Sequence, residues 1–529
     1  MKMSETLEVL DRRWRNACRV VFKQDVGPLF DYIPWLSEFA NTPILKKSDL
    51  SGKEVTFAFD DYAEGAGRVS FDEIDFKRKF EPLGINEVKD IDSIVEALEE
   101  RFAYAGNVIL GNCGNLERCS NVYDSFYMHG VLNLGDSRYM LGCSFGRLNE
   151  DCFGTYGPGE SSFCIRCTQT YREKRCFEVW NSQNTSDSYY SYGLDNCSDC
   201  IFCFSLENRG HSVGNLKLEK SKYEAIKSKL LEEISEKLGK EKRLPSLIDI
   251  AEKAERPKLR LPEAEDFEKY WTGDKSPVER EFSKTTKLVL GKELKPIDDY
   301  REWLKRHTHR IEERTSVASG KRLLMLPSMI AIPEIPHDRI VSLGEAKILG
   351  ERASLNEEEA EGLTLANAHE RIGRLAFFKV DIREGANSNV PECSACVSSS
   401  NCYHSSGIVY AKHCGYTFWP RSTQNAFGCD SMTDSSFCIN CYRSVKLTRC
   451  FEMDTCRTCS DSLFCHNCEK VDNSMFSFNA KSLRNAIGNA PLPRDKYEVV
   501  RSSLLGQIGE ELEKNKDLKW DIFNIGRRR

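Results

Sequence analysis

The sequence lacks the features of membrane, secreted and strongly basic proteins. No run of apolar residues approaches the ~18 that a transmembrane helix needs. The first residues mix charged and apolar side chains instead of forming the apolar segment of a secretory signal. The 75 lysines and arginines are outnumbered by 81 aspartates and glutamates, so the net charge is -6, which argues against a generally basic nucleic-acid coat. We therefore expect no membrane insertion, and a cytoplasmic or virion-associated protein.

The sequence motifs of the common enzyme classes are also missing. There is no phosphate-binding P-loop, no glycine-rich dinucleotide-binding turn, no HExxH zinc-protease motif and no GxSxG nucleophile elbow. The nine histidines are scattered along the chain. A structural or binding protein is therefore expected more than an enzyme.

Cysteine is abundant but unevenly placed, and long parts of the chain have none. Of the 23 cysteines, Cys18 stands alone, ten lie from Cys113 to Cys203, and twelve lie from Cys393 to Cys468. An odd total excludes complete internal disulfide pairing, and a reducing compartment keeps thiols free or bound to metal. Two cysteine-rich modules are therefore embedded in a cysteine-free framework.

The chain repeats itself with one large offset. SSFCIRC at residue 161 matches SSFCINC at 435, and RCFE at 175 matches RCFE at 449, both at an offset of 274. Upstream the offset is 268, where PLFDYIPWL at 28 matches PIDDYREWL at 296. We expect a tandem duplication, with one unit from about 12 to 240 and the other from about 280 to 515.

A shorter repeat lies inside each unit. Cysteines recur at a spacing of 24 in residue number, and short aromatic segments bounded by Asn, Asp, Ser and Gly recur at intervals of 11 to 14 along the chain. A fixed period with strand-like segments predicts a parallel β-solenoid of about 24 residues per coil, with small cysteines in an inward ladder. A string of zinc ribbons is the alternative. The cysteines that carry this spacing are Cys119, Cys143 and Cys167; Cys152, Cys176 and Cys200; Cys414 and Cys438; and Cys441 and Cys465.

The remaining segments predict the fold class α+β, with a small α/β subdomain before each cysteine-rich module and a capping helix after it. Helices are expected over 16–38, 91–106 and 284–307, and strands over 53–60 and 321–332. The predicted domains are a first α/β subdomain (1–105), a first solenoid (106–217), a capping helix (218–240), a linker (241–279), a second α/β subdomain (280–384), a second solenoid (385–490), and a capping helix with a basic tail (491–529).

The end of the first module carries a family resemblance. The stretch DNCSDCIFCFSLENRGHSVGN (195–215), followed by Lys222-Tyr223-Glu224 and its helix, resembles a diffuse group of cysteine-rich short-repeat proteins of uncultivated bacteria, archaea and phages. The resemblance covers residues from about 113 to 238 and, less well, from 393 to 512. That group often has a cysteine before the final Asn, where this chain has Gly214 and Gly488. The resemblance supports the solenoid and implies no chemistry.

The cysteine pairs are the first candidates for a functional site. Cys-x-x-Cys spacing is the usual half-site for tetrahedral zinc. The sequence leaves open zinc, an iron–sulfur cluster, and a ladder of buried thiols without metal, so the cofactor is expected to be none or zinc. The candidate ligands are Cys164, Cys167 and Cys176; their counterparts Cys438, Cys441 and Cys450; and the run Cys456, Cys459, Cys465 and Cys468.

Charged residues beside these cysteines are the second candidates. One interpretation is a surface ion pair on the exterior of a coil. The other is a basic ridge for phosphate or RNA, with stacking on tyrosines such as Tyr189 and Tyr190. The two sets, again related by the offset of 274, are Arg172, Arg175 and Glu178, and Lys446, Arg449 and Glu452.

These observations favour a non-enzymatic scaffold or interaction protein that docks on a larger assembly, or on itself, through its solenoid faces. A zinc-dependent nucleic-acid or ribosome-binding factor is the first alternative. A solenoid hydrolase is the second, because Glu178 and Asp187 are acidic groups on the module. A cysteine-based redox enzyme belongs to the same alternative.

Overall fold

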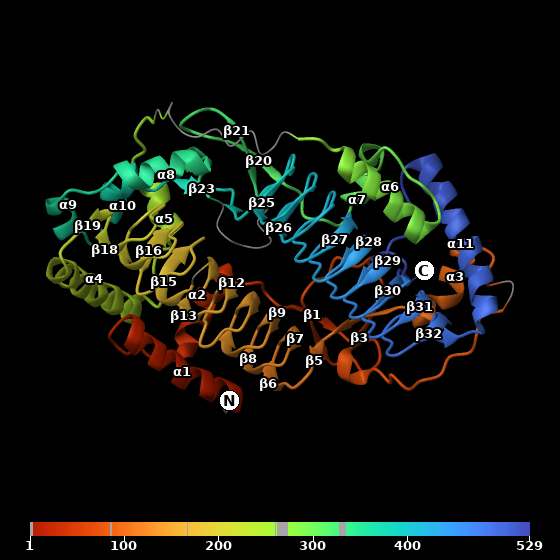
Figure 1. Cartoon of the computed structure of the whole chain (residues 1–529). Coiled ribbons are helices and arrows are strands. Elements are labelled where there is room, and N and C mark those ends of the chain that lie inside the picture. Colours follow the sequence, from red (N-terminus) through yellow and green to blue (C-terminus); the bar gives the residue numbers. More distant parts are fainter. Residues whose placement is uncertain are drawn as a thin grey trace.

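The computed structural model describes residues 4–84, 87–166, 168–259, 261, 273–326 and 335–528. It is a mixed α/β structure in which short parallel strands form two groups flanked by helices (Figure 1). We call the strands within residues 109–213 the first stack and those within residues 383–487 the second stack. No helix in the described ranges combines the length and the apolar character that crossing a bilayer requires.

Helices and two small sheets precede the first stack. The antiparallel pair β1–β2 and the parallel pair β3–β4 are the sheets. The expected helix over 16–38 is interrupted in its middle. Residues 16–21 belong to α1 and 29–38 to η1, α2 and η2, but the chain leaves the first helix at Val21 and turns at Gly27 (φ 112°) before Pro28. The expected helix over 91–106 is present in its first part, and its last residues form the strand β4 instead. The elements are α1 (Glu5–Val21), η1 (Leu29–Tyr32), α2 (Ile33–Leu36), η2 (Ser37–Phe39), β1 (Ile44–Lys47), β2 (Glu54–Phe57), β3 (Gly67–Ser70), η3 (Phe71–Glu73), α3 (Ile91–Leu98), η4 (Glu99–Arg101) and β4 (Ala103–Gly106).

The first stack follows and ends in two helices. Its last strand, β18, pairs antiparallel with the two-residue strand β19. The elements are β5 (Ile109–Leu110), β6 (Gly114–Glu117), β7 (Ser120–Tyr123), β8 (Phe126–His129), β9 (Leu132–Gly135), β10 (Arg138–Leu141), β11 (Ser144–Arg147), β12 (Tyr156–Gly159), β13 (Ser162–Ile165), β14 (Thr168–Tyr171), β15 (Lys174–Trp180), β16 (Tyr189–Tyr192), β17 (Ser198–Ile201), β18 (Gly210–Val213), β19 (Leu216–Lys217), α4 (Lys220–Glu241) and α5 (Leu247–Lys253).

The segment before the second stack has a similar succession of elements. The expected helix over 284–307 instead ends at Leu290, where Gly291 takes the left-handed conformation (φ 76°) that closes a helix. The expected strand over 321–332 is present as β21, and its residues 327–332 lie outside the described ranges. The elements are α6 (Ser276–Leu290), η6 (Ile297–Tyr300), α7 (Arg301–Leu304), β20 (Glu312–Thr315), β21 (Arg322–Met325), η7 (His337–Arg339), β22 (Ile340–Val341), α8 (Leu343–Arg352), α9 (Glu357–Glu361), α10 (Ala368–Arg371), η8 (Ile372–Arg374) and β23 (Phe378–Lys379).

The second stack repeats the plan of the first. Its last strand, β32, also pairs antiparallel with a two-residue strand, β33, and a long helix follows. The elements are β24 (Arg383–Glu384), β25 (Ser394–Val397), β26 (Ser406–Val409), β27 (Gln424–Phe427), β28 (Ser436–Tyr442), β29 (Thr448–Asp454), β30 (Leu463–His466), β31 (Asp472–Met475), β32 (Arg484–Ile487), β33 (Ala490–Pro491) and α11 (Arg494–Asn515).

Neighbouring strands of both stacks are joined in a register of twelve residues, except that the first pair of each stack, β5–β7 and β24–β25, is offset by thirteen. Cys164 pairs with Cys176, and Cys438 pairs with Cys450. The same separation relates the isolated bridges, such as Arg457 with Glu469. The expected period of 24 between neighbouring coils is therefore wrong. Cysteines at a spacing of 24 lie two steps apart in the stack, and the intervening step places another inward residue between them, such as Val131 between Cys119 and Cys143.

Within each twelve-residue step the backbone has a period of three. Every third residue takes the left-handed conformation, as from Arg166 (φ 59°) and Gln169 (φ 52°) through Arg172 (φ 53°) and onward. All the cysteines of the first module are separated from one another by multiples of three, as are all those of the second. The side chains of this cysteine series point inward and form the cores of the stacks. Two successive inward positions are three residues apart, so cysteines at both of them give the Cys-x-x-Cys spacing.

The two long helices lie along the flanks of the stacks rather than over their open ends (Figure 1). In α4, Lys227 contacts Asp199 of the stack, and the Ser235 hydroxyl donates to the carbonyl of Phe22, which follows α1. The apolar face predicted from the sequence is buried, with Tyr223 and Leu230 among its members. The end of each stack is covered by a different part of the chain.

Each small subdomain covers the end of the other half's stack. Leu355 donates its backbone N–H to the carbonyl of Gly214 (2.9 Å), at the last strand of the first stack. Reciprocally, the Arg101 guanidinium donates to the carbonyl of Gly488 (2.9 Å), at the last strand of the second stack. A Cβ at Gly214 would overlap Leu355, and one at Gly488 would overlap Leu98. The two halves are therefore locked together crosswise, which Figure 1 shows as β3 lying beneath the second stack.

Candidate functional site

The cysteines proposed as metal ligands are buried in the inward series. The Cys456 thiol donates to the carbonyls of Asp454 and Cys465, both at 3.3 Å, and the Cys450 thiol donates in the same way to Thr448 (3.4 Å) and Cys459 (3.6 Å). Burial raises the pKa of Cys176, Cys450, Cys456 and Cys465 well above that of a free thiol, whereas Cys468 is also buried but has its pKa lowered by hydrogen bonds with Cys456 and Cys465. Zinc binding requires thiolates, so protonated thiols that bond to carbonyls are poor ligands.

No group of three or more His, Cys, Asp or Glu among the described residues is arranged to hold a metal ion. The candidate Cys167 lies outside the described residues. The remaining candidates are all buried: Cys164, Cys176, Cys438, Cys441, Cys450, Cys456, Cys459, Cys465 and Cys468. The structure therefore places these nine candidates as lining of the two stack cores.

The arginines proposed for phosphate or RNA contact are paired with carboxylates. Arg175 bonds Asp187, twelve residues further along and just before β16 (Nε–Oδ1 2.8 Å), and Arg449 bonds Asp461, just before β30, in the same way (2.7 Å). Arg172 bonds Glu160 (2.7 Å), and Lys446 is exposed. Because three of the four cations are neutralised by a neighbour, they do not form an uncompensated basic ridge.

Glu178 and Glu452 are fully buried, so the expected surface position is wrong for both. Their side chains point from left-handed backbone positions toward the flanking helices instead of toward solvent. Burial raises the pKa of Glu178, and burial together with the charge of Asp521 raises that of Glu452. Each carboxylate serves a structural contact.

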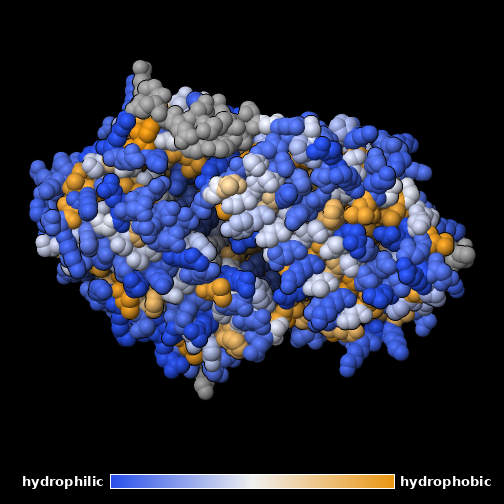
Figure 2. Space-filling model, viewed as in Figure 1, coloured by the Kyte–Doolittle hydropathy of each residue, from blue (hydrophilic) through white to orange (hydrophobic). Residues whose placement is uncertain are grey.

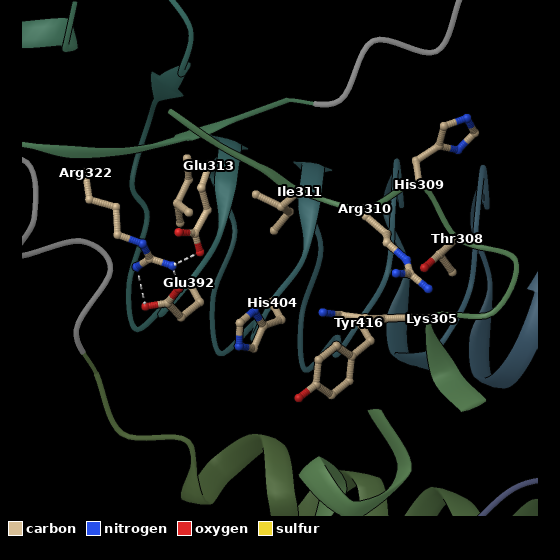
Figure 3. A pocket seen from close by; sticks show the side chains of 11 residues that line it. Lys305, Thr308, His309, Arg310, Ile311, Glu313, Arg322, Glu392, His404 and Tyr416 are labelled. Carbon is tan, nitrogen blue, oxygen red and sulfur yellow. Dashed lines mark hydrogen bonds and ion pairs between the residues drawn. The ribbon is translucent and has the colours of Figure 1, made fainter. Parts of the chain in front are cut away.

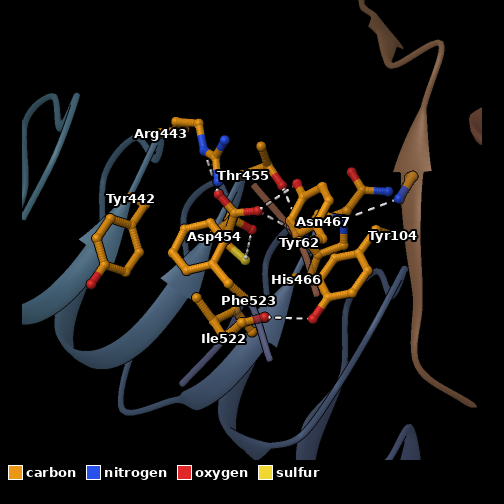
Figure 4. Close-up of polar contacts among 12 residues, drawn as sticks. Tyr62, Tyr104, Tyr442, Arg443, Asp454, Thr455, His466, Asn467, Ile522 and Phe523 are labelled. Carbon is orange, nitrogen blue, oxygen red and sulfur yellow. Dashed lines mark hydrogen bonds and ion pairs between the residues drawn. The ribbon is translucent and has the colours of Figure 1, made fainter. Parts of the chain in front are cut away.

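A buried polar network joins the first subdomain to the second stack (Figure 4). Asp454 accepts hydrogen bonds from Arg443 Nε (2.8 Å) and Tyr62 OH (2.9 Å), and its Oδ2 lies 2.9 Å from His466 Nδ1. On the other side of the ring, His466 Nε2 accepts from the backbone N–H of Ala105 (3.1 Å). Because Nε2 is an acceptor, Nδ1 carries the proton that faces Asp454.

This network is closed to substrate. Asp454, His466 and Tyr62 are all buried, and both ring nitrogens of His466 are engaged within the protein. Burial by itself would raise the pKa of Asp454, but Arg443 and His466 hold it at about 2. The resemblance to an Asp–His catalytic pair is therefore structural, and the pair anchors strand β4 to the second stack.

One small cavity opens beside the second stack (Figure 3). It has a volume of about 80 Å³ and lies between the segment 305–324 and the left-handed positions of the stack. His404 and Tyr416 occupy two such positions twelve residues apart, with their rings stacked at 5.3 Å and an interplanar angle of 10°. The Lys305 ammonium lies 5.3 Å from the centre of the Tyr416 ring. Sequence analysis did not single out these residues, because no motif surrounds them.

The comparisons with known proteins give no family and no relative. No protein-family model, no curated protein and no solved structure matches the chain significantly. The function therefore has to be argued from the contacts described above.

Proposed function

We propose that each stack is a β-solenoid with twelve residues per coil and that the chain is a tandem duplication of one such unit. The support is that contacts recur at one offset. The pairs Cys164–Cys176 and Arg175–Asp187 return at the offset of 274 as Cys438–Cys450 and Arg449–Asp461. A duplicated unit whose halves cover each other's ends is a rigid body with no unpaired strand at those ends.

We infer that this body is a non-enzymatic scaffold that docks on a larger protein assembly. The single observation that carries the inference is a line of exposed corner residues along the second stack, which we call the corner column. Its members repeat every twelve residues, so they are spaced by about one strand separation, ~4.8 Å. The column consists of Ser422, Asp434, Lys446, Thr458, Lys470 and Ser482.

A docking face of this kind is polar rather than apolar. The face seen in Figure 2 is mainly hydrophilic, with only scattered apolar residues and a hollow near its centre. The serines, the threonine and the aspartate of the column are short and lose little conformational entropy when they bind, and its two lysines add charge, so even modest contacts add up along the column. Apart from Lys446, which belongs to the column, the described candidate residues are engaged in internal contacts, which favours a structural role over catalysis.

An affinity pull-down from the native host at low salt tests this proposal. The double variant Lys446→Glu/Lys470→Glu changes the corner column, and Lys284→Glu/Lys287→Glu makes the same charge change on α6, where both lysines are 66% exposed. We expect the wild type and the α6 variant each to retain one assembly in stoichiometric amount. The corner-column variant should fail to retain that assembly. Absence of a stoichiometric partner, or equal loss with both variants, would contradict the proposal.

A further inference from the structure

The cavity beside His404 has an excess of positive charge that the protein does not neutralise. Arg322 at one end is held by two carboxylates, with Nη1–Oε1 of Glu392 at 3.0 Å and an ion pair to Glu313. At the other end, Lys305 has no carboxylate within ion-pair distance among the described residues. Arg310 has only Glu302, at 3.8 Å, and both of these side chains are largely exposed. Two cations at the mouth are therefore available to an anion.

Neutral hydrogen-bonding groups complete the lining. Burial, assisted by the charge of Lys305, lowers the pKa of His404 to about 4, so its imidazole is neutral at pH 7 and offers both a donor and an acceptor. Thr308 adds a hydroxyl to the lining. The Tyr416 ring is fixed because its hydroxyl donates to Asp298 and accepts from Arg301 Nε (3.2 Å). The Tyr416 ring is thus held by neighbours outside the cavity, and Arg322 by Glu313 and Glu392 within its lining.

The first half of the chain has no such lining, although its backbone is alike. Subtracting the offset of 274 from the numbers of His404 and Tyr416 leads to Gly130 and Gly142, which take the same left-handed conformation (φ 63° and 60°). Subtracting the upstream offset of 268 from Lys305 leads to Ser37, whose Oγ lies 3.9 Å from the position of a Cβ on Gly142. Two rings and an ammonium therefore stand in the second half where the first has two glycines and a serine.

We propose that this cavity binds the phosphate group of a small ligand, with Lys305 and Arg310 facing its two charges and His404 and Thr308 bonding its oxygens. The cavity volume of 80 Å³ leaves room for a phosphate group, since a cavity volume of roughly 10–15 Å³ already holds one water molecule. A phosphate dianion matches two unneutralised cations better than a carboxylate monoanion does. This binding is independent of the scaffold role, because the corner column and the cavity share no residue.

Calorimetric titration of the full chain at constant ionic strength tests the site with three probes: inorganic phosphate, glycerol 3-phosphate and acetate. We expect saturable binding of at least one phosphate probe below 10 mM and none of acetate. Binding of both phosphate probes indicates recognition of the phosphate alone, whereas tighter binding of the ester indicates a phosphorylated metabolite.

Matched variants decide whether the cavity is the site. Lys305→Met and Arg310→Gln should each weaken the binding at least tenfold, and Arg310 is exposed enough that its replacement leaves the fold intact. Lys284→Met removes an equivalent charge on α6 and should have no effect. Acetate binding as tightly as phosphate, no saturation by 10 mM, or equal weakening by Lys284→Met would each overturn the proposal.

Discussion

Glu178 and Glu452, which the offset of 274 relates, each accept a backbone N–H from the segment that follows the long helix of their own half. Glu178 Oε2 accepts from Leu247 (3.0 Å), and Glu452 Oε2 accepts from Ile522 (2.9 Å). The two residues therefore fasten the returning chain to the stack in the same manner. Their surroundings differ in one respect, since Glu178 lies beside the buried Arg166 (3.4 Å), whereas Asn440 donates to Glu452 (3.1 Å).

This difference predicts unequal effects of the same substitution. Glu178→Gln leaves the buried guanidinium of Arg166 with Glu38 (3.1 Å) as its remaining carboxylate, so the variant should lose about 1–3 kcal/mol of unfolding free energy. Glu452→Gln keeps one oxygen to accept from Ile522 and can donate its NH2 to the Asn440 amide oxygen once that amide turns over, so it should cost about 1 kcal/mol or less, because the raised pKa of Glu452 already favours a neutral group. The urea midpoints of the two variants give the comparison. Equal midpoints would show that Arg166 does not depend on Glu178.

The arrangement of the stacks was partly predictable from sequence. Short strand-like segments at intervals of 11 to 14 indicated the true step, whereas cysteine spacing alone does not decide the period, because six cysteine pairs are spaced by 12 and six by 24. Any small apolar side chain fills an inward position, so the identity of one residue type is a poor guide to the period. The long helices and the strand β2 were predicted close to where they occur.

The crosswise packing and the cavity could not be predicted. The contact between Leu98 and Gly488 joins residues in opposite halves, and no local pattern encodes it. The burial of Glu178 depends on the left-handed backbone, which turns its side chain toward the helices instead of solvent. His404 and Tyr416 were missed because each is an ordinary residue in sequence, and only the twelve-residue register brings their rings together.

The network at Asp454 predicts an acid-sensitive junction between the halves. Its folded pKa of about 2 lies below the ~3.9 of an unfolded aspartate, so it contributes stability above about pH 4 that is lost as the pH falls toward 2. The contribution is about 2–3 kcal/mol. The rate of amide hydrogen exchange in β4, measured as a function of pH, reports this contribution, because the Ala105 N–H donates to His466.

Asp454→Asn should accelerate exchange of β4 at pH 7 and flatten its dependence on pH below 4. Asp461→Asn is the control, because Asp461 pairs with Arg449 in a partly exposed bridge, where such pairs contribute about 0–1 kcal/mol. Unchanged exchange in Asp454→Asn would mean that the junction is held by its aromatic contacts alone.

The burial of the thiols predicts selective alkylation. Cys113 is the one half-buried cysteine among those described, and all the others are buried. Iodoacetamide should therefore label Cys113 first in the native protein, and most other thiols only after denaturation. Peptide mass spectrometry at short times gives the site, and Cys113→Ala should remove the fast phase. Rapid labelling of Cys456 or Cys459 would show that the stack core opens.

Metal removal should leave the protein unchanged. The thiols whose contacts are described bond to backbone carbonyls, so the native protein should carry less than half an equivalent of zinc or iron per chain by elemental mass spectrometry. Treatment with a chelator should not lower its melting temperature. A stoichiometric amount of metal, or a melting temperature that a chelator lowers by several degrees, would show that the cysteines bind metal.

His404 predicts a second dependence on pH, distinct from that of Asp454. Its folded pKa of about 4 is below the ~6.5 of an unfolded histidine, so the unfolded chain binds the proton first as the pH falls. Unfolding free energy should therefore decrease between about pH 6.5 and 4, by on the order of 1–3 kcal/mol for this partly exposed ring. His404→Gln removes the titrating group and should flatten that part of the curve, while Asp454→Asn should leave it in place. Chemical denaturation at half-unit pH steps separates the two, and an unchanged slope in His404→Gln would show that the ring is not held neutral by its surroundings.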